Sequence, residues 1–345
     1  SWRTATACDA GCMPEVKTMQ SNVLLDIRNL KKYYPVTQGA FKKVTGYVKA
    51  VDDVSLRVSA GQTLGIVGES GCGKTTMGKC IVRLHKPTSG QMLYTIDGEQ
   101  REDGEQRDLL SLSREESFQM RRQIQIVFQD PYAALNPMKN ILSTFDEPLK
   151  LHGFGGREQR REIVAEMLRR VNLQPDYMYR FPHEFSGGQR QRICIAKALS
   201  LQPRLVVCDE PVSALDVSIQ AQILNLMKAL QEELKLTYVF IAHDLSVVQY
   251  MSDSIAVMYL GKVVEFGTAE QVYNDSRHPY TQALLSAVPI PIPGAKKDRI
   301  LLEGDVPSPA NPPAGCPFHP RCPKCMEICR SAAPEMKDDG CGHCT

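Results

Sequence analysis

The chain has 345 residues, which suits about two domains of ordinary size. Hydrophobic residues make up 43% and charged residues 23%, which excludes a disordered chain and a miniature fold that depends on disulfides. The 41 Lys and Arg residues against 39 Asp and Glu give a net charge of +2, too balanced for a surface that grips nucleic acid. Apolar runs such as 238–242 and 255–260 are far shorter than the ~18 residues of a membrane-spanning helix.

The first part of the chain is predicted to pass from a flexible leader into two strands. Residues 1–21 show no periodicity, and we expect them to form that leader. Dense aliphatic residues predict a short strand at 23–27, and alternation predicts a second strand at 48–58. A basic loop that contains glycine is expected between them, at about 34–46.

The rest of the main domain alternates strands with helices. A buried strand at 64–67 leads through a glycine-rich turn into a helix that begins at Lys74. Between 128 and 205 the chain is expected to be mostly helical, with 157–171 as the clearest amphipathic stretch. Further strands are expected at 124–128, 205–208 and 238–242, and in a hairpin over 255–266 that turns at Gly261-Lys262. This alternation predicts an α/β fold with a mostly parallel sheet covered on both faces.

A change of composition near residue 288 predicts a domain boundary. Prolines then break any long element: Pro289, Pro291, Pro293, Pro307, Pro309, Pro312 and Pro313. We therefore expect a main domain over 22–288 and a short, irregular, Cys- and Pro-rich C-terminal extension over 289–345. The first twenty residues lack the apolar core and cleavage site of a secretion signal, so the cysteines are expected to be reduced in the cytoplasm.

The spacing of one motif predicts a phosphate-binding loop. Eight residues between the strand at 64–67 and the following helix fit G-x-x-x-x-G-K-[ST]: Gly68, Glu69, Ser70, Gly71, Cys72, Gly73, Lys74 and Thr75. The glycines let successive backbone N–H groups point at a phosphate, and the helix N-terminus adds partial positive charge. Lys74 is expected to reach the β- and γ-phosphates, and the Thr75 hydroxyl to ligate Mg²⁺.

Two carboxylates follow a second apolar strand. Asp209 stands at the end of the strand at 205–208, where it suits contact with Mg²⁺, directly or through water. Glu210 comes next and is expected to polarise an attacking water as a general base. Without a phosphate-binding loop upstream, such a pair would be read as a solvated strand end.

A second potential anion site begins another helix. Ser186, Gly187, Gly188 and Gln189 precede the helical run at 190–199. Ser186 and Gln189 have the spacing of a capping box, which is the structural interpretation. The two glycines, however, leave bare N–H groups at a positive dipole end, which can also hold an anion.

Together these motifs resemble the ATPase subunits of ABC transporters. The set comprises residues 68–75, Gln129 within Val127-Phe128-Gln129-Asp130-Pro131, residues 186–189, Asp209-Glu210, Ser213-Ala214-Leu215-Asp216 and His243. The resemblance implies a P-loop NTPase with an antiparallel β subdomain and a helical subdomain at about 130–200. It also implies a head-to-tail dimer, in which residues 186–189 of one subunit close over the ATP bound to the P-loop of the other.

The same resemblance implies roles for single residues. Gln129 would ligate Mg²⁺ and couple the attacking water to a membrane partner, and His243 would contact the γ-phosphate. Asp216 would communicate across the dimer, and Thr76 would join the P-loop in binding ATP. An aromatic ring upstream is expected to stack on adenine; Tyr34 is favoured slightly over Tyr47, and either ring could instead serve packing.

The C-terminal part looks like that of oligopeptide and dipeptide importer ATPases, above all the second ATPase subunits of dipeptide permeases. The likeness rests on residues 278–285 (HPYTQALL) and 315–323 (GCPFHPRCP). It implies a sister ATPase subunit, in a heterodimer or homodimer, two transmembrane permeases and an extracytoplasmic peptide-binding protein, with no nucleic acid. The chain would then be peripheral, on the cytoplasmic face of the inner membrane. A nickel importer of the same subgroup, a soluble non-transport ABC ATPase and a metal- or redox-sensing protein are the alternatives.

Six of the twelve cysteines lie in the last 30 residues, and their ligand set stays open. Cys322, Cys325, Cys341 and Cys344 have the spacing of a zinc site. The family likeness instead selects Cys316, Cys322, Cys329 and Cys344 for a [4Fe–4S] cluster, and free thiols are the third possibility. Cys72, Cys80, Cys194 and Cys208 are expected to be small buried hydrophobes.

Overall fold

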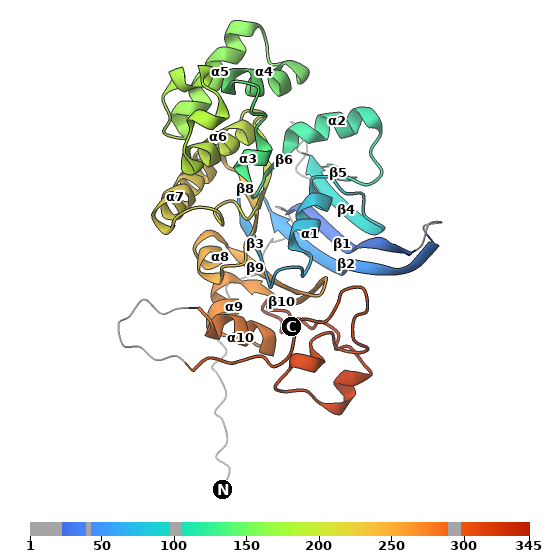
Figure 1. The fold of residues 1–345 in the computed structure, drawn as a ribbon. Coiled ribbons are helices and arrows are strands. Elements are labelled where there is room, and N and C mark those ends of the chain that lie inside the picture. The colour runs from blue at the N-terminus through green and yellow to red at the C-terminus, as the bar shows by residue number, and fades with distance from the viewer. Residues whose placement is uncertain (1–22, 39–42, 97–104, 289–297) are drawn as a thin grey trace, which may run out of the picture.

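The computed structural model describes residues 23–38, 43–96, 105–288 and 298–345 (Figure 1). The leader predicted over 1–21 lies outside these residues. The described chain forms two sheets, a group of helices at one end and a C-terminal extension at the opposite end.

The central sheet has six strands in the order β10-β9-β3-β8-β7-β6. Five of them run parallel, and β10 pairs antiparallel with β9, so the predicted mostly parallel sheet and the C-terminal hairpin are confirmed. Every residue of β3, β7 and β8 is buried, which explains why these segments read as apolar runs. The bounds are β3 Thr63–Val67, β6 Ile124–Val127, β7 Leu205–Asp209, β8 Thr237–Ile241, β9 Ser254–Tyr259 and β10 Lys262–Thr268.

The second sheet is antiparallel, with the order β2-β1-β4-β5. Its strands are β1 Val23–Gln38, β2 Lys43–Ser59, β4 Ser89–Ile96 and β5 Glu105–Asp108. The loop predicted at 34–46 is therefore wrong over most of its length, because β1 continues to Gln38 and β2 begins at Lys43. This outer half of the β1–β2 ribbon is largely exposed, so it carries little of the apolar alternation that marks a strand.

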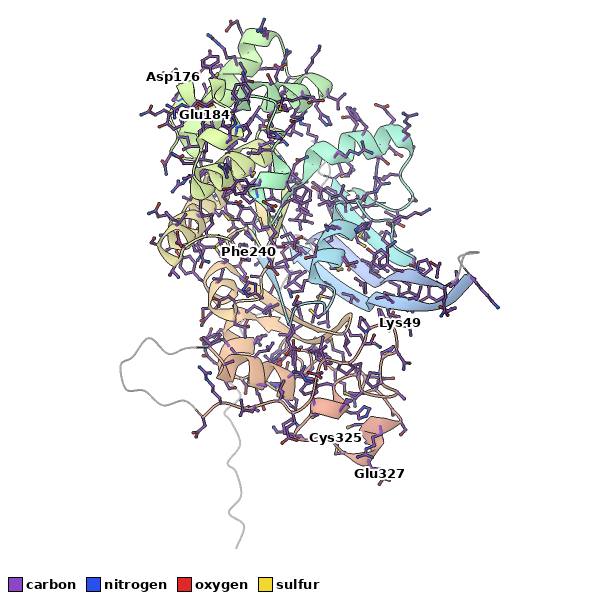
Figure 2. All side chains as sticks on the ribbon, in the orientation of Figure 1. Lys49, Asp176, Glu184, Phe240, Cys325 and Glu327 are labelled. Carbon is purple, nitrogen blue, oxygen red and sulfur yellow. The ribbon has the colours of Figure 1, made fainter. Side chains whose placement is uncertain are left out.

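The helices cover both faces of the central sheet. On one face α1 contacts β7 and β8, and its buried residues share a core with β1, β2 and β4. On the other face the helices α4 to α8 and α10 share a second core with the same sheet, and this core includes Phe240 of β8, labelled in Figure 2. The helices are α1 Lys74–Ile81, α2 Arg114–Gln123, α3 Pro131–Ala134, α4 Ile141–Leu151, α5 Arg157–Arg170, α6 Gly187–Leu199, α7 Val217–Leu234, α8 Leu245–Met251, α9 Ala269–Asn274 and α10 Pro279–Ser286, with the 3₁₀ turns η1 Pro175–Tyr179 and η2 Pro182–Glu184. Every helix in the described part of the chain is too short or too polar to cross a bilayer.

The C-terminal extension is held to the main domain by two buried anchors. Its only helical turns in the described residues are η3 His319–Arg321 and η4 Glu327–Arg330. Phe318 is 1% exposed and packs its ring against Tyr259 and Tyr280, at centroid distances of 5.2 and 5.4 Å. Near the C-terminus, His343 Nε2 lies 2.8 Å from the fully buried Glu265 carboxylate. The extension is therefore part of the packed structure.

The Phe318 anchor leads to a stability prediction. We expect Phe318→Ala to lower the free energy of unfolding by about 3–5 kcal/mol, because a fully buried aromatic ring leaves a cavity when it is removed. Urea denaturation followed by circular dichroism measures the change. Ile328→Ala is the control: this residue is 63% exposed in the same extension, and its change should stay within about 0.5 kcal/mol. Equal effects of the two substitutions would contradict the anchor.

Candidate functional site

The P-loop leaves β3 at Val67 and enters α1 at Lys74, as its motif predicts. Two of its glycines are required by close backbone contacts. A Cβ on Gly73, whose φ is +109°, would lie 2.0 Å from the carbonyl oxygen of Ala50. A Cβ on Gly68, whose φ is +156°, would lie 2.2 Å from the carbonyl oxygen of Met258. Neither position can take a side chain, so the loop stays narrow enough to wrap a phosphate.

Lys74 is buried within this loop, at 4% exposure. Its Nζ donates to the carbonyl oxygens of Gly68, at 2.7 Å, and of Glu69, at 3.0 Å. A buried ammonium is stable only when hydrogen-bonded, and these carbonyls hold it beside the loop's backbone N–H groups. The positive charge is thus fixed where a triphosphate would lie.

Thr75 and Asp209 meet although 134 positions separate them. The Thr75 hydroxyl donates to Asp209 Oδ1 at 2.9 Å, because β3 and β7 lie parallel on either side of β8 and end at the same edge of the sheet. Burial raises the pKa of Asp209, and the hydrogen bond from Thr75 opposes that shift. Hydroxyl and carboxylate oxygens of this kind, and the amide oxygen of Gln129, which lines one cavity with Thr75, are the ligands that Mg²⁺ prefers.

Glu210 brings together two further predicted residues. Its Oε2 accepts a hydrogen bond from Gln129 Nε2 at 3.0 Å and lies 3.3 Å from His243 Nδ1. Gln129 Nε2 also lies 3.5 Å from Ser213 Oγ. Glu210 has a φ of +46°, a left-handed conformation that is costly for a residue with a side chain and typical of functional sites. The strained backbone directs a carboxylate toward the loop.

A cavity of about 270 Å³ joins the P-loop to these groups. It is lined by Val48, Ala50, Ser70, Gly71, Gly73, Lys74, Thr75, Thr76, Gln129, Glu210 and Pro309. In the β1–β2 ribbon Tyr34 pairs with Val48, whereas Tyr47 pairs with Pro35. Paired residues in an antiparallel sheet point to one face, so Tyr34 shares the face of the cavity-lining Val48. Burial raises the pKa of the Tyr34 hydroxyl, and its hydrogen bond with Thr76 opposes the shift. Of the two rings, Tyr34 is therefore the one on the cavity side of the ribbon.

The glycine motif at the start of α6 lies apart from this cavity. Ser186 and Gln189 form the predicted capping box, with Ser186 N–H to Gln189 Oε1 at 3.0 Å and Gln189 N–H to Ser186 Oγ at 3.3 Å. Gly188 faces Ile219 of α7, whose side chain would be 2.7 Å from an added Cβ. Asp216 is the N-cap residue of the same α7, with no side-chain cap hydrogen bond. The motif and Asp216 therefore belong to one surface, and neither lines the P-loop cavity of its own chain.

The cysteines of the described residues fall into a buried group in the main domain and a more exposed group in the extension. Cys72, Cys80, Cys194 and Cys208 are buried, as predicted, and burial raises the pKa of Cys80 to about 11. In the described part of the chain, no group of three or more His, Cys, Asp or Glu side chains is arranged to hold a metal ion. The backbone of Cys344 pairs with that of Phe266 in β10, at 2.7 and 2.9 Å, which fixes the end of the chain but leaves the thiol unused by this contact. The structure therefore assembles neither the predicted cluster set nor the predicted zinc set.

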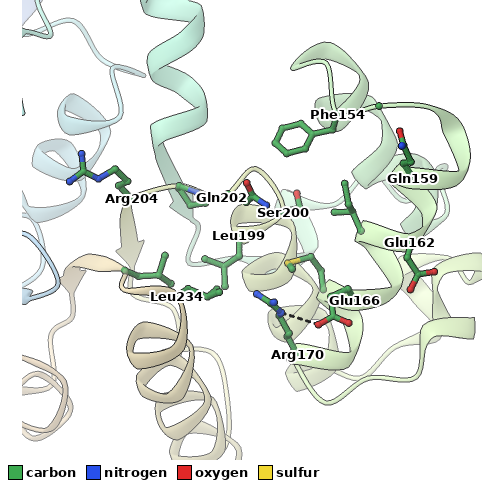
Figure 3. A pocket seen from close by; sticks show the side chains of 15 residues that line it. Phe154, Gln159, Glu162, Glu166, Arg170, Leu199, Ser200, Gln202, Arg204 and Leu234 are labelled. Carbon is green, nitrogen blue, oxygen red and sulfur yellow. Dashed lines mark hydrogen bonds and ion pairs between the residues drawn. The ribbon is translucent and has the colours of Figure 1, made fainter. Parts of the chain in front are cut away.

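A larger cavity, of about 930 Å³, lies away from every predicted site residue (Figure 3). It is formed by α5, the end of α6 and the end of α7, with Met167, Leu199 and Leu234 among its lining. Its charged pair Glu166–Arg170, drawn at its edge, is an ion pair of one helix at 3.2 Å. Size alone does not identify a site, and this cavity gathers no set of reactive groups.

Sequence reasoning missed three residues of the extension and α10 that reach the P-loop. Arg321 pairs with Glu69, Tyr280 Oη accepts the N–H of Glu69 at 2.8 Å, and Pro309 lines the cavity. Figure 2 shows Lys49 of β2 close above the extension, and the Lys49 N–H donates to the Pro309 carbonyl at 3.3 Å. Such contacts depend on tertiary packing and have no local sequence signal.

Comparisons with known proteins agree with this arrangement. The family profile described as ABC transporter matches residues 51–213, and that of the oligopeptide/dipeptide transporter C-terminal region matches residues 264–329. The chain is 52% identical over 323 residues to the oligopeptide transport ATP-binding protein AppF of Bacillus subtilis, covering 93% of this chain and 95% of that protein. It is 49% identical over 317 residues to the dipeptide transport ATP-binding protein DppF of Escherichia coli, covering 92% of each. A solved dimeric ATP-binding cassette in a post-hydrolysis state with ADP and Pi matches with a TM-score of 0.60 and 30% identity, over 71% of this chain and 99% of that one.

The P-loop contains one glycine with a close backbone neighbour, Gly73, and one with open space around it, Gly71, and this difference gives a prediction. Gly73→Ala combines a positive φ with a clash against Ala50, and we expect it to lower the free energy of unfolding by about 3 kcal/mol or more. Gly71 has a φ of +81° with open space around a Cβ, so Gly71→Ala should lose only about 1–2 kcal/mol. Thermal denaturation without nucleotide measures both. A loss at Gly73 no larger than that at Gly71 would show that the contact with Ala50 does not constrain the loop.

Proposed function

The chain belongs to the ABC transporter family, as one of its ATP-binding subunits, and from this premise we propose that it hydrolyses ATP to power the import of dipeptides or oligopeptides. The observation that carries this proposal is the Glu210 carboxylate. It is aimed at a cavity that also holds Lys74 and Thr75. The matched C-terminal region and the peptide-transport names of the relatives support a peptide cargo over nickel.

The groups around the cavity divide the chemistry of hydrolysis between them. Lys74 and the backbone N–H groups of the loop bind the β- and γ-phosphates and stabilise the charge that develops on transfer. Glu210 accepts the proton of the attacking water, with Gln129 and His243 fixing its Oε2. Mg²⁺, held by Thr75 and Asp209 together with Gln129, would neutralise phosphate charge.

The second ATP contact is proposed to come from a partner subunit. In this chain the capped start of α6 does not line the P-loop cavity, so its bare glycines remain available to another subunit. The dimeric state of the 30% identical cassette supports a head-to-tail pairing, with Asp216 beside the junction. We propose that Ser186–Gln189 contact the ATP of a sister ATPase subunit, and that two permeases and an extracytoplasmic peptide-binding protein complete the transporter. The chain would then be peripheral, at the cytoplasmic face of the membrane.

Replacement of the proposed base tests the proposal directly. Glu210→Gln should keep ATP binding and lower the hydrolysis rate roughly 10²–10⁴-fold, because the amide cannot accept the proton of the water. Lys74→Ala should lose ATP binding itself. ATP turnover in the assembled transporter and ATP affinity of the chain are the two measurements.

The matched control for this test is Glu232→Gln, an exposed carboxylate on α7. Its turnover should equal that of the unmodified chain. If Glu210→Gln also turned over at the unmodified rate, Glu210 would not be the base, and unchanged ATP affinity in Lys74→Ala would overturn the P-loop assignment.

The tail cysteines give a separate prediction from the family likeness. A [4Fe–4S] cluster on Cys316, Cys322, Cys329 and Cys344 would require these four thiols to converge, an arrangement that the described residues do not show. Anaerobic purification with iron, zinc and sulfide analysis tests it. About four iron and four sulfide per chain would support the cluster, about one zinc per chain would support the zinc set, and neither metal would reject both sets.

A further inference from the structure

The C-terminal extension binds the phosphate-binding loop directly. Arg321, in η3, has a side chain only 8% exposed, and its guanidinium makes a two-pronged contact with the Glu69 carboxylate. Nη1 lies 2.8 Å from Oε2 and Nη2 lies 3.1 Å from Oε1. The hydrogen bonds to Glu69 are the main reason that the pKa of Arg321 is raised. Paired forks of this kind fix geometry as well as charge.

Glu69 is fixed at its backbone as well. Its N–H donates to Tyr280 Oη at 2.8 Å, and Tyr280 is fully buried. The Tyr280 ring packs against Tyr259 at a centroid distance of 4.8 Å, and Phe318 of the extension packs against both. The second residue of the P-loop therefore rests on a rigid aromatic cluster that is shared between the main domain and the extension.

The backbone carbonyl of Glu69 connects the aromatic cluster and Arg321 to Lys74, at the end of the loop that enters α1. Its oxygen accepts from Lys74 Nζ at 3.0 Å, next to the hydrogen bond that the same ammonium donates to the Gly68 carbonyl. One residue thus binds Arg321 through its carboxylate, Tyr280 through its N–H and Lys74 through its carbonyl. The backbone of Glu69 therefore links the contact with Arg321 to the carbonyl that holds the Lys74 ammonium.

The charge of Glu69 makes the pairing with Arg321 necessary. It is the only acidic residue among the eight of the motif, and its side chain is 28% exposed. An unpaired carboxylate this close to a triphosphate repels it, and the partly buried position weakens the screening by water. Arg321 neutralises this charge, and neither Arg321 nor Glu69 lines the P-loop cavity.

We propose that Arg321 is a positioning residue for ATP binding, through which the C-terminal extension sets the affinity of the P-loop by neutralising and orienting Glu69. The inference rests on the proposed function, because the ligand is the same ATP. It adds a role for the extension in the nucleotide site that the motif residues alone do not have.

The test is a double-mutant cycle on the full chain, with MgATP displacing a fluorescent ATP analogue. Arg321→Gln should weaken ATP binding about 5- to 20-fold, because it leaves Glu69 charged and unpaired. Glu69→Gln should change the affinity less than about 2-fold, and Arg321→Gln combined with Glu69→Gln should recover to within about 3-fold of the unmodified chain. Arg321→Lys should lie in between, since one ammonium cannot form the fork.

The double variant and a control separate positioning from folding. Arg321→Gln alone and its combination with Glu69→Gln both lack the ion pair. If the single variant bound ATP weakly only because the fold was destabilised, the double variant would therefore bind just as weakly. Melting temperatures are recorded on the same samples. Arg330→Gln, an exposed arginine of η4, should bind ATP as the unmodified chain does. In the assembled transporter Arg321→Gln should raise the KM for ATP and change kcat less than about 2-fold.

Three results would overturn the inference. Equal weakening in Arg321→Gln and in the double variant would make the contact purely structural, and unchanged affinity in Arg321→Gln would remove its role. A fall in kcat at unchanged KM would place the effect in the chemistry instead of in binding. If the unmodified chain failed to bind MgATP, the proposed function would fail first, and that result differs from all three.

Discussion

The parallel packing of β3, β8 and β7 is the constraint on which the nucleotide site depends. These strands are fully buried and end at one edge of the sheet, so the residues that follow them meet there regardless of their distance along the chain. The contact of Thr75 with Asp209 is the direct result, and Glu210 follows one residue later on a left-handed backbone. A slip of β7 by one residue would turn Asp209 away from the loop.

The loop between β3 and α1 depends in turn on its neighbours. The carbonyl oxygens of Ala50 and Met258 lie so close to Gly73 and Gly68 that neither glycine has room for a Cβ. Strands from both sheets therefore constrain the loop. The extension adds the remaining support through Arg321 and Tyr280. The P-loop is therefore supported by β2, β9, α10 and the extension, all of which lie outside the motif in sequence.

The sequence predicted those parts of the site whose chemistry is local. The buried strands, the glycine turn and the carboxylates at residues 209–210 stand out because apolar runs and glycine spacing are periodic or contiguous. The outer β1–β2 ribbon was missed because its residues are exposed and lack alternation. Arg321 was missed because a contact across 252 positions leaves no pattern in either segment. The tail cysteines show the converse: their spacing suggested ligand sets, but the described part of the chain brings no three His, Cys, Asp or Glu side chains into a metal-binding arrangement.

The hydrogen bonds of the Lys74 ammonium determine what an arriving anion encounters. Both carbonyl acceptors belong to the loop itself and use two of the three N–H donors of the ammonium, so a phosphoryl oxygen meets a cation already held by protein oxygens and not a hydrated one. The dehydration of this ammonium is already complete in the folded chain, where it is 4% exposed. The heat of phosphate binding at this position therefore contains little contribution from removing water from the cation and reflects mainly the rearrangement of the oxygen acceptors around it.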